Sequence, residues 1–233
     1  MQTYVSRGGL IQLTSLGGIE GPRRRLLYRG AEADIVRGSW RNLPAVYKIR
    51  KPLPYRLASL DITIRRQRTL REAELLHSAR RAGVHAPWLY YVDASRTTLV
   101  MEYVEGIMMK EFASSAPKEE AGDFFCALGR DTARLHSAGI THGDLTTANV
   151  IIRDGELVFI DFGLANHTTR LEDHAVDLRL IKETLVGAHN SIASMAFERV
   201  MEGYTHVAGA KRAEAVAGQL RSIERRGRYA RLS

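Results

Sequence analysis

The chain has 233 residues, of which 45% are hydrophobic, so it can bury a real core and is not an intrinsically disordered protein. Lys and Arg number 34 against 26 Asp and Glu, and the net charge of +8 favours a polyanionic partner. No apolar stretch is long enough to span a bilayer, and the first residues lack the basic-then-apolar order of a signal peptide. Cys126 is the one cysteine, so no internal disulfide can form, and we expect a cytoplasmic protein without membrane contact.

The N-terminal part of the chain predicts an antiparallel sheet. Residues 1–25 contain two Gly-Gly pairs, and we expect a loosely ordered arm or an extra strand there. Apolar runs at 26–28, 34–36 and 45–49 predict three strands. A loop of small residues joins the first two strands, and its backbone N–H groups can approach a phosphate. The loop consists of Gly30, Ala31, Glu32 and Ala33.

Lys48 lies mid-strand among apolar neighbours, where a charge is costly unless it is paired. It therefore needs an anion, either a nucleotide phosphate or a carboxylate, unless it occupies the exposed face of an edge strand. Residues 53–83 read as a helix, in which Glu72 is the candidate partner of Lys48. The alternative for Glu72 is a capping box with Thr69 as the helix N-cap. The apolar residues expected to pack are Leu70, Ala73, Leu75, Leu76 and Ala79.

Two further strands are expected at 88–92 and 98–104, and Gly106 marks a break that we take as a lobe boundary. Residues 117–139 form an amphipathic helix in which Cys126 is a core residue. Gly139 closes this helix.

A β-hairpin is expected next. The apolar runs 150–152 and 157–160 flank Asp154-Gly155, a pair that readily adopts the positive φ angles of a tight turn. The hairpin brings its outer ends together, so the residues before the first strand approach the residue after the second.

Those outer ends carry Asp144, Asn149 and Asp161. Carboxylate and amide oxygens suit Mg²⁺, and one carboxylate is left to accept a proton from an attacking hydroxyl or water. Phosphoryl transfer needs this arrangement, and the order Asp, Asn, then Asp-Phe-Gly matches that of kinases. The alternative is a polar hairpin with solvated carboxylates. We expect His136 and His142 to be core or backbone-anchoring residues rather than metal ligands.

After Gly163 the chain reaches the segment 172–178, Glu-Asp-His-Ala-Val-Asp-Leu, within about fifteen residues. One helix is expected through Val186 and another around 192–201. Residues 221–233 are rich in arginine and contain a single acid, which is typical of a solvated tail or of a nucleic-acid contact. The arginines that we single out are Arg225, Arg226, Arg228 and Arg231.

With these motifs in place, the chain resembles a protein kinase over residues 26–205. More closely, it is similar to the small atypical kinase subunit of the KEOPS complex. The features that carry this likeness are the Gly-Ala-Glu-Ala loop, the Arg-Thr-Leu-Arg-Glu-Ala stretch at 68–73, His-Gly-Asp-Leu-Thr at 142–146, the segment 172–178 and the arginine-rich end.

The resemblance implies an α+β, two-lobed, minimal protein-kinase-like fold. Its N-lobe, 26–104, is an antiparallel β-sheet with one main helix. Its C-lobe, 105–220, is mostly helical and contains the catalytic β-hairpin, and 221–233 forms the tail.

The resemblance also implies roles for individual residues. Lys48 holds the ATP phosphates and pairs with Glu72, and Asp144 is the general base or water-positioning group. Asn149 and Asp161 bind Mg²⁺. The remaining residues implied near the nucleotide are the loop Gly30 to Ala33 and the hinge residues Glu102 and Val104, with Asp177 and Gly163 as structural residues beside the site.

The function implied is that of a Mg-ATP-dependent atypical serine/threonine kinase that acts mainly as an ATPase in threonylcarbamoyladenosine modification of tRNA. Its partners are the threonylcarbamoyl-transferring subunit, other KEOPS subunits and, through the complex, tRNA. Gly143 replaces the arginine that grips a phosphorylated activation loop, and no Ala-Pro-Glu follows Gly163. These departures favour water or a partner-held group as the nucleophile over a free peptide.

Three alternatives stay open. A small-molecule kinase of the aminoglycoside or choline type also uses His-Gly-Asp followed by Asn, but it usually has a larger helical lobe than the 70 residues after Gly163 would make. A Rio-type kinase normally adds a winged-helix domain, which residues 1–25 cannot form. A partner-binding pseudokinase scaffold is the third, although every catalytic position is filled.

Overall fold

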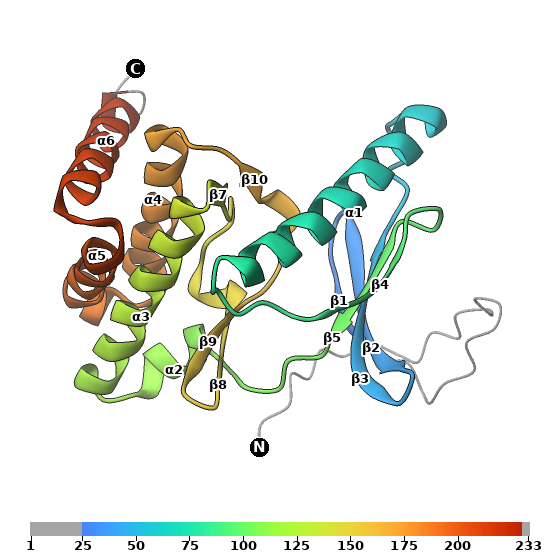
Figure 1. Cartoon of the computed structure of the whole chain (residues 1–233), viewed down its shortest axis with the longest axis horizontal. Helices are drawn as coiled ribbons and strands as arrows, with labels where there is room; N and C mark the ends of the chain where they lie inside the picture. Colours follow the sequence, from blue (N-terminus) through green and yellow to red (C-terminus); the bar gives the residue numbers. More distant parts are fainter. Residues whose placement is uncertain (1–24, 230–233) are drawn as a thin grey trace. The chain divides into compact units, whose positions relative to one another are not determined.

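The computed structural model describes residues 25–229, which divide into two compact units (Figure 1). The first unit holds the described residues up to His77 together with Pro87–Tyr103. The second unit holds Ser78–Ala86 and the described chain from Val104 onward. The arm expected at 1–25, apart from Arg25, and the end of the expected tail, with Arg231, lie outside the described residues.

The first unit is built on a five-stranded antiparallel sheet of order β1-β2-β3-β5-β4. β3 lies in its centre between β2 and β5. Val36, Ala45, Tyr47 and Val100 form the buried cluster of this sheet. The strands are β1 Arg25–Arg29, β2 Ala33–Trp40, β3 Leu43–Arg50, β4 Leu89–Asp93 and β5 Thr98–Glu102.

Helix α1, Ala58–Arg81, runs along this sheet (Figure 1). Ala73, Leu75, Leu76 and Ala79 are buried, as predicted. One expectation and one alternative for this helix are wrong. Leu70 is 46% exposed, so it is not part of the packed face.

The second correction concerns the capping box. The helix begins at Ala58, so Thr69 lies well inside it and caps nothing. The Thr69 hydroxyl donates instead to the carbonyl oxygen of Arg65 at 2.8 Å, the internal bond that buried threonines make in helices. Glu72 is therefore not part of a cap.

The second unit is mostly helical. Its elements are β6 Ile107–Met108, α2 Met109–Ser115, α3 Lys118–Ser137, β7 Ile140–Thr141, the 3₁₀ turn η1 Thr147–Asn149, β8 Val150–Arg153, β9 Glu156–Phe159, η2 Phe162–Leu164, β10 Asn166–His167, α4 Leu171–Ala188, η3 Asn190–Ile192, α5 Ala193–Ala208 and α6 Ala210–Tyr229. An antiparallel-sheet unit and a mostly helical unit make up the α+β kinase-like fold, which confirms the predicted fold class. Within residues 25–229, no helix is both long and apolar enough to cross a membrane.

The predicted hairpin is present. β8 and β9 pair antiparallel from Val150↔Phe159 to Arg153↔Glu156. Asp154 and Gly155 form the turn, with φ angles of 52° and 80°. The left-handed conformation at both positions is what a two-residue turn between twisted strands requires.

Helix α6 changes the expectation for the end of the chain. The boundary that we placed at 220/221 falls inside α6. Leu220 is buried, and Lys182 of α4 pairs with Glu224 at 2.7 Å. Arg226 pairs with Glu172 at 2.8 Å. The arginine-rich segment up to Tyr229 therefore continues a helix that packs on α4.

Helices α3 and α5 cross at two glycines, Gly129 and Gly203. A Cβ on Gly129 would overlap the carbonyl oxygen of Val200, and a Cβ on Gly203 would overlap that of Cys126. The two backbones are thus in direct contact, which only glycine permits. Cys126 is buried beside this crossing, as predicted.

The crossing gives a stability prediction. Gly203→Ala should lower the free energy of unfolding by roughly 2–3 kcal/mol, because the new methyl group meets backbone that cannot rotate away. Gly218→Ala in α6 is the matched control, since its Cβ would have ordinary contacts only. The control should stabilise the helix by up to about 1 kcal/mol. Urea unfolding of both variants measures the difference, and equal midpoints would contradict a close crossing.

Candidate functional site

Lys48 of β3 forms a buried ion pair with Glu72 of α1. The Lys48 ammonium lies 2.7 Å from Oε1 of Glu72, and both residues are less than 10% exposed. Because β3 is a central strand, the alternative of a lysine on an exposed edge strand is wrong. The apolar neighbours of Lys48 indicated that it needs an anion, and the likeness to kinases named Glu72 as its partner; the fold brings the two into contact.

Arg50 completes this cluster and was not predicted from the sequence. Its Nη2 lies 2.5 Å from Oε2 of Glu72, so each carboxylate oxygen has its own cation. Lys48 and Arg50 lie two residues apart on one strand, so both project from the same face of the sheet. That spacing is the signal that could have identified Arg50.

The small-residue loop between β1 and β2 is tied by its own hydrogen bonds. The N–H of Gly30 donates to Ala33 O at 2.9 Å, and the Lys51 ammonium donates to Gly30 O at 2.6 Å. Arg68 of α1 binds the Glu32 carboxylate at 2.5 Å. The loop is therefore held to β3 and α1, and its first N–H is already used within the turn.

The expected hinge residues lie at the end of β5. Glu102 exchanges hydrogen bonds with Trp88, whose N–H donates to the Glu102 carboxylate at 3.1 Å. The N–H of Glu102 donates to Trp88 O, and that of Tyr103 to Pro44 O. Val104 is buried. A ligand at this segment would therefore bind to the backbone N–H and C=O groups that these hydrogen bonds do not use.

In the second unit, Asp144 and Asn149 are in direct contact. The Asn149 side-chain amide donates to the Asp144 carbonyl at 2.8 Å and to its Oδ2 at 2.9 Å. The 3₁₀ turn η1 separates the two residues and brings them back together. The Asp144 carboxylate is thus oriented through one oxygen, and its second oxygen is not part of this bond.

Asp161 follows the hairpin in a strained conformation. Its φ and ψ are 61° and 67°, in the left-handed region that residues with a Cβ rarely adopt. Its Oδ1 accepts the N–H of Gly163 at 3.2 Å. Next to it, the N–H of Ile160 donates to Asn149 O at 2.9 Å, which fastens the start of the hairpin to its end. Strain of this kind is concentrated at functional sites.

The donor set at the base of the hairpin fits Mg²⁺ better than a metal that needs a full protein cage. Within residues 25–229, no cluster of three or more His, Cys, Asp or Glu side chains is spaced to hold a metal ion. Asn149 and Asp161 offer oxygen donors at the two ends of one hairpin. Mg²⁺ takes one or two protein oxygens and completes its shell with phosphate oxygens and water.

Asp177 of α4 supports the loop that carries Asp144. Its Oδ2 accepts the N–H of His142 at 2.7 Å, and its Oδ1 accepts that of Gly143 at 2.8 Å. His136 Nε2 adds a third bond at 3.2 Å. Burial alone would raise the pKa of Asp177, but the hydrogen bond and charge of His136, with the N–H of His142, lower it below its usual value. The buried carboxylate is therefore ionised.

The predictions for the two histidines are confirmed. His142 Nε2 donates to the carbonyl oxygen of Ile160 at 3.0 Å, which anchors the backbone. His136 is buried between Asp177 and Tyr204. Because a carboxylate only accepts, His136 donates to Asp177 through Nε2, and its Nδ1 lies 3.0 Å from the Tyr204 hydroxyl oxygen.

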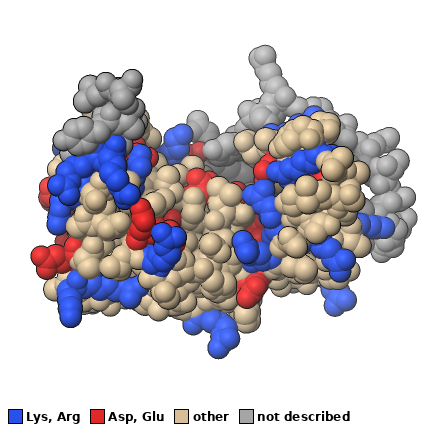
Figure 2. Space-filling model, turned by 90° about the horizontal axis from the view of Figure 1, so that it is seen from above, with Lys and Arg blue, Asp and Glu red and all other residues tan. Residues whose placement is uncertain are grey.

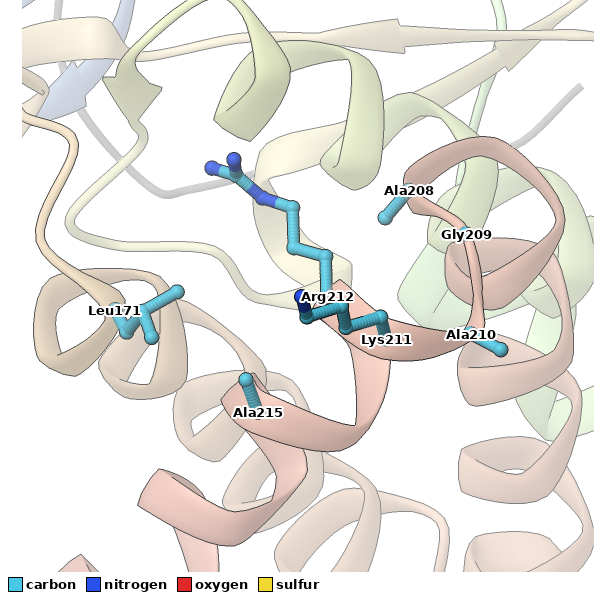
Figure 3. Close-up of a pocket in the computed structure, with 7 residues that line it drawn as sticks. All are labelled: Leu171, Ala208, Gly209, Ala210, Lys211, Arg212 and Ala215. Atoms are coloured by element: carbon cyan, nitrogen blue, oxygen red, sulfur yellow. The ribbon is translucent and has the colours of Figure 1, made fainter.

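A hollow of about 480 Å³ lies elsewhere in this unit, where α5 meets α6 (Figure 3). Among the residues described, small apolar side chains and Leu171 make up most of its lining. The Arg212 side chain runs away from Ala215 and α6, and its guanidinium binds His136 O at 3.2 Å. None of the predicted site residues lines this hollow, so it contributes nothing to the candidate site.

Comparison with known proteins decides the family. The protein kinase domain family matches residues 55–200. The KEOPS complex subunit Bud32 of Pyrococcus abyssi is 38% identical over 211 residues, which cover 88% of this chain and 96% of that protein. The chain belongs to the Bud32 family of protein kinases.

Other Bud32-like sequences are parts of longer proteins. Probable bifunctional tRNA threonylcarbamoyladenosine biosynthesis proteins of Methanobrevibacter smithii and Methanothermobacter thermautotrophicus are each 41% identical, over 88% and 92% of this chain. The chain spans 36% and 38% of their lengths. The Rio2 kinase of Chaetomium thermophilum, solved with ADP and Mg²⁺, shares the fold with a TM-score of 0.61 at 18% identity, over 86% of this chain and 70% of that one.

This Bud32-family chain departs from regulated kinases at Gly143. Its φ is 78°, and a Cβ there would overlap the carbonyl oxygen of Leu164 in η2. The residue before the proposed base therefore touches the backbone just after Asp-Phe-Gly. An arginine in this position would require that turn to move.

A prediction follows from His174, which stacks on His136 at 4.2 Å between ring centroids. Burial lowers the pKa of His174 from 6.5 to about 4; His136 and the Arg212 guanidinium oppose a further positive charge, although Thr168 O and Asp177 favour it. Below pH 6.5 the unfolded chain therefore binds a proton on His174, whereas the folded chain binds this proton only near pH 4. Stability should fall by on the order of 2–3 kcal/mol as pH drops through this window.

The measurement is the free energy of unfolding between pH 7 and pH 4 for the wild type and for His174→Gln. Gln keeps a donor and an acceptor but does not titrate, so its curve should be flatter. Burial also lowers the pKa of His189, and the wild-type and variant curves share that contribution. Parallel curves would show that His174 does not titrate as described.

Proposed function

We propose that this protein is a Mg-ATP-dependent atypical serine/threonine kinase that acts mainly as an ATPase in threonylcarbamoyladenosine modification of tRNA. Its membership of the Bud32 family makes it a phosphotransferase or ATPase of the kinase class. The observation that carries most weight is the buried Lys48–Glu72 ion pair. Burying such a pair costs free energy, and in kinases a lysine–glutamate pair of this kind holds the lysine on the nucleotide phosphates.

We assign the reacting groups as follows. Lys48 binds the ATP phosphates while Glu72 orients its side chain, and Asn149 and Asp161 are the protein ligands of Mg²⁺. The bound ion would neutralise charge on the phosphates. Asp144 accepts the proton of, or orients, the attacking hydroxyl or water through Oδ1, since the Asn149 amide holds Oδ2. The loop Gly30 to Ala33 covers the phosphates, and backbone at Glu102 and Val104 reads adenine.

We assign a structural role to the two residues that shape this loop. Asp177 fixes the backbone before Asp144 through the N–H groups of His142 and Gly143. Gly163 supplies the N–H that the Asp161 carboxylate accepts. Both interactions orient a reacting carboxylate without touching the substrate.

We propose that the partners are other KEOPS subunits, among them the threonylcarbamoyl-transferring one, with tRNA bound through the complex. The Pyrococcus relative is named as a KEOPS subunit. In the bifunctional relatives, the part that matches this chain is joined to about twice its length of other sequence. Such fusion supports a kinase that works beside a second activity of the same pathway.

We propose water or a partner-held group as the phosphoryl acceptor. Gly143 leaves no arginine to bind a phosphorylated activation loop, and only η2 and β10 separate Asp161 from α4. A peptide substrate therefore has little surface on which to dock. A small-molecule kinase is disfavoured by the family assignment, and a pseudokinase by the complete set of catalytic positions.

The first functional prediction concerns Asp144. Asp144→Asn keeps the hydrogen bond from Asn149 but loses the base, so ATP turnover should fall by roughly a hundredfold or more. Asp161→Ala should abolish the Mg²⁺ dependence of ATP binding. Turnover of purified protein, alone and with KEOPS subunits and tRNA, gives the measurement, and tRNA modification by the reconstituted complex is the second readout.

Two outcomes would contradict this proposal. Wild-type tRNA modification by either variant would mean that the chain acts as a scaffold. A peptide substrate that is phosphorylated faster than the partner-stimulated complex hydrolyses ATP would mean that the acceptor is a peptide.

A further prediction concerns the arginines of α6. Lys and Arg side chains gather over the C-terminal helices, on the left of Figure 2. Arg221 and Arg225 are exposed, whereas Arg226 is paired with Glu172. Deleting 221–233 would remove packed helix, so point substitutions are the better test. Arg228 has no described side chain.

Arg221→Ala with Arg225→Ala should weaken tRNA binding by the complex and reduce the slope of log affinity against log salt by roughly one to two, because fewer counterions are released. Arg66→Ala on α1, also an exposed arginine in a helix, is the control. An unchanged slope in the double variant, or an equal loss in the control, would argue against a phosphate contact on α6.

A further inference from the structure

Arg50 lies on strand β3 and binds two residues of α1 beside the Lys48–Glu72 ion pair. Its Nη2 binds Oε2 of Glu72 at 2.5 Å, and its Nη1 lies 3.4 Å from the Thr69 hydroxyl. Thr69 and Glu72 are one turn apart on the same face of α1. One guanidinium, 5% exposed, therefore spans a full turn of the helix beside the ion pair.

The backbone of Arg50 is fixed independently of Glu72. Its N–H donates to Thr97 O at 3.1 Å, and its carbonyl accepts the Thr97 hydroxyl at 3.1 Å. Arg65 of α1 donates to the same carbonyl at 3.3 Å and pairs with Asp61 at 2.7 Å. Thr97 has a φ of 50°, so this turn is strained and closely held. The backbone from which the Arg50 side chain projects is thus held in place, and the guanidinium itself is held by Glu72 and Thr69.

The two cations on Glu72 differ in chemistry. A lysine ammonium is a point charge on a flexible stem and can turn toward a phosphate. An arginine guanidinium stays charged and binds a carboxylate in a fixed geometry. A buried carboxylate that loses its sole cation is costly, so a helix held by one lysine would loosen when that lysine engages a ligand.

We propose that Arg50 is a positioning residue that keeps Glu72 and helix α1 docked on the sheet while Lys48 is engaged by nucleotide phosphate. This inference rests on the proposed function, because it takes ATP as the ligand of Lys48. It assigns the docking of α1 to Arg50 and leaves Lys48 to the substrate. A kinase of this kind has its helix in place permanently and needs no signal to bring it there.

The test compares Arg50→Met with Lys48→Met by hydrogen exchange at the amides of residues 69–76, with and without Mg-ATP. In Lys48→Met, Arg50 still holds Glu72, so protection of α1 should match that of the wild type. In Arg50→Met, Lys48 is the remaining cation on Glu72, so protection should fall by about tenfold or more when Mg-ATP engages Lys48, and by less without nucleotide. Arg50→Lys keeps the charge but loses the span to Thr69, and it should restore protection in part.

ATP affinity supplies the readout that a purely structural role would not move. At a temperature well below the unfolding transition, Arg50→Met should bind Mg-ATP about tenfold more weakly than the wild type, since Glu72 then depends on Lys48 alone. Arg66→Met, an exposed arginine of the same helix, should bind as the wild type does.

The outcomes separate the two claims. Equal α1 exchange in Arg50→Met and the wild type, or equal loosening in both methionine variants, would overturn the inference. Reduced protection with unchanged ATP affinity would make Arg50 a stabilising residue only and would also overturn it. If the wild type shows no Mg-dependent ATP binding, the proposed function fails, whereas the exchange comparison without nucleotide still decides what holds α1.

Discussion

The second unit depends on one buried negative charge. The Asp177 carboxylate accepts hydrogen bonds from His136 and from the N–H groups of His142 and Gly143. Two of these three bonds hold the backbone that leads to Asp144. Desolvation would neutralise the carboxylate if those donors were absent. The loop and the charge thus stabilise each other, and the aromatic and imidazole groups of α3, α4 and α5 around it serve to keep water out.

Local pattern was a good guide wherever a motif has its own chemistry. The Asp154-Gly155 turn and the need of Lys48 for an anion could be read from residue type and spacing, whereas Glu72 as its partner came from the likeness to kinases. The family resemblance gave the fold class. The turn depends on a short-range signal, whereas the Lys48–Glu72 pair joins residues 24 apart in the sequence and forms only in the folded chain.

Features that depend on long-range packing were missed or misread. Thr69 and Glu72 have the spacing of a capping box, but they lie inside a helix that begins at Ala58, where Asp61 binds Arg65 and accepts the Leu53 N–H. Leu70 has the right spacing for the core yet faces outward. The arginine-rich end reads as a tail, although Leu220 and two ion pairs pack it on α4. For the end of the chain, the deciding contacts come from α4, which the pattern of residues 221–233 does not identify.

The overlap between a side chain at position 143 and the Leu164 carbonyl has an evolutionary consequence. An arginine at position 143 would have no room until the turn after Asp-Phe-Gly had also changed, so one substitution cannot introduce control by a phosphorylated activation loop. Intermediates with only one of the two changes would be handicapped. Control by a neighbouring protein would need no such paired change in this chain.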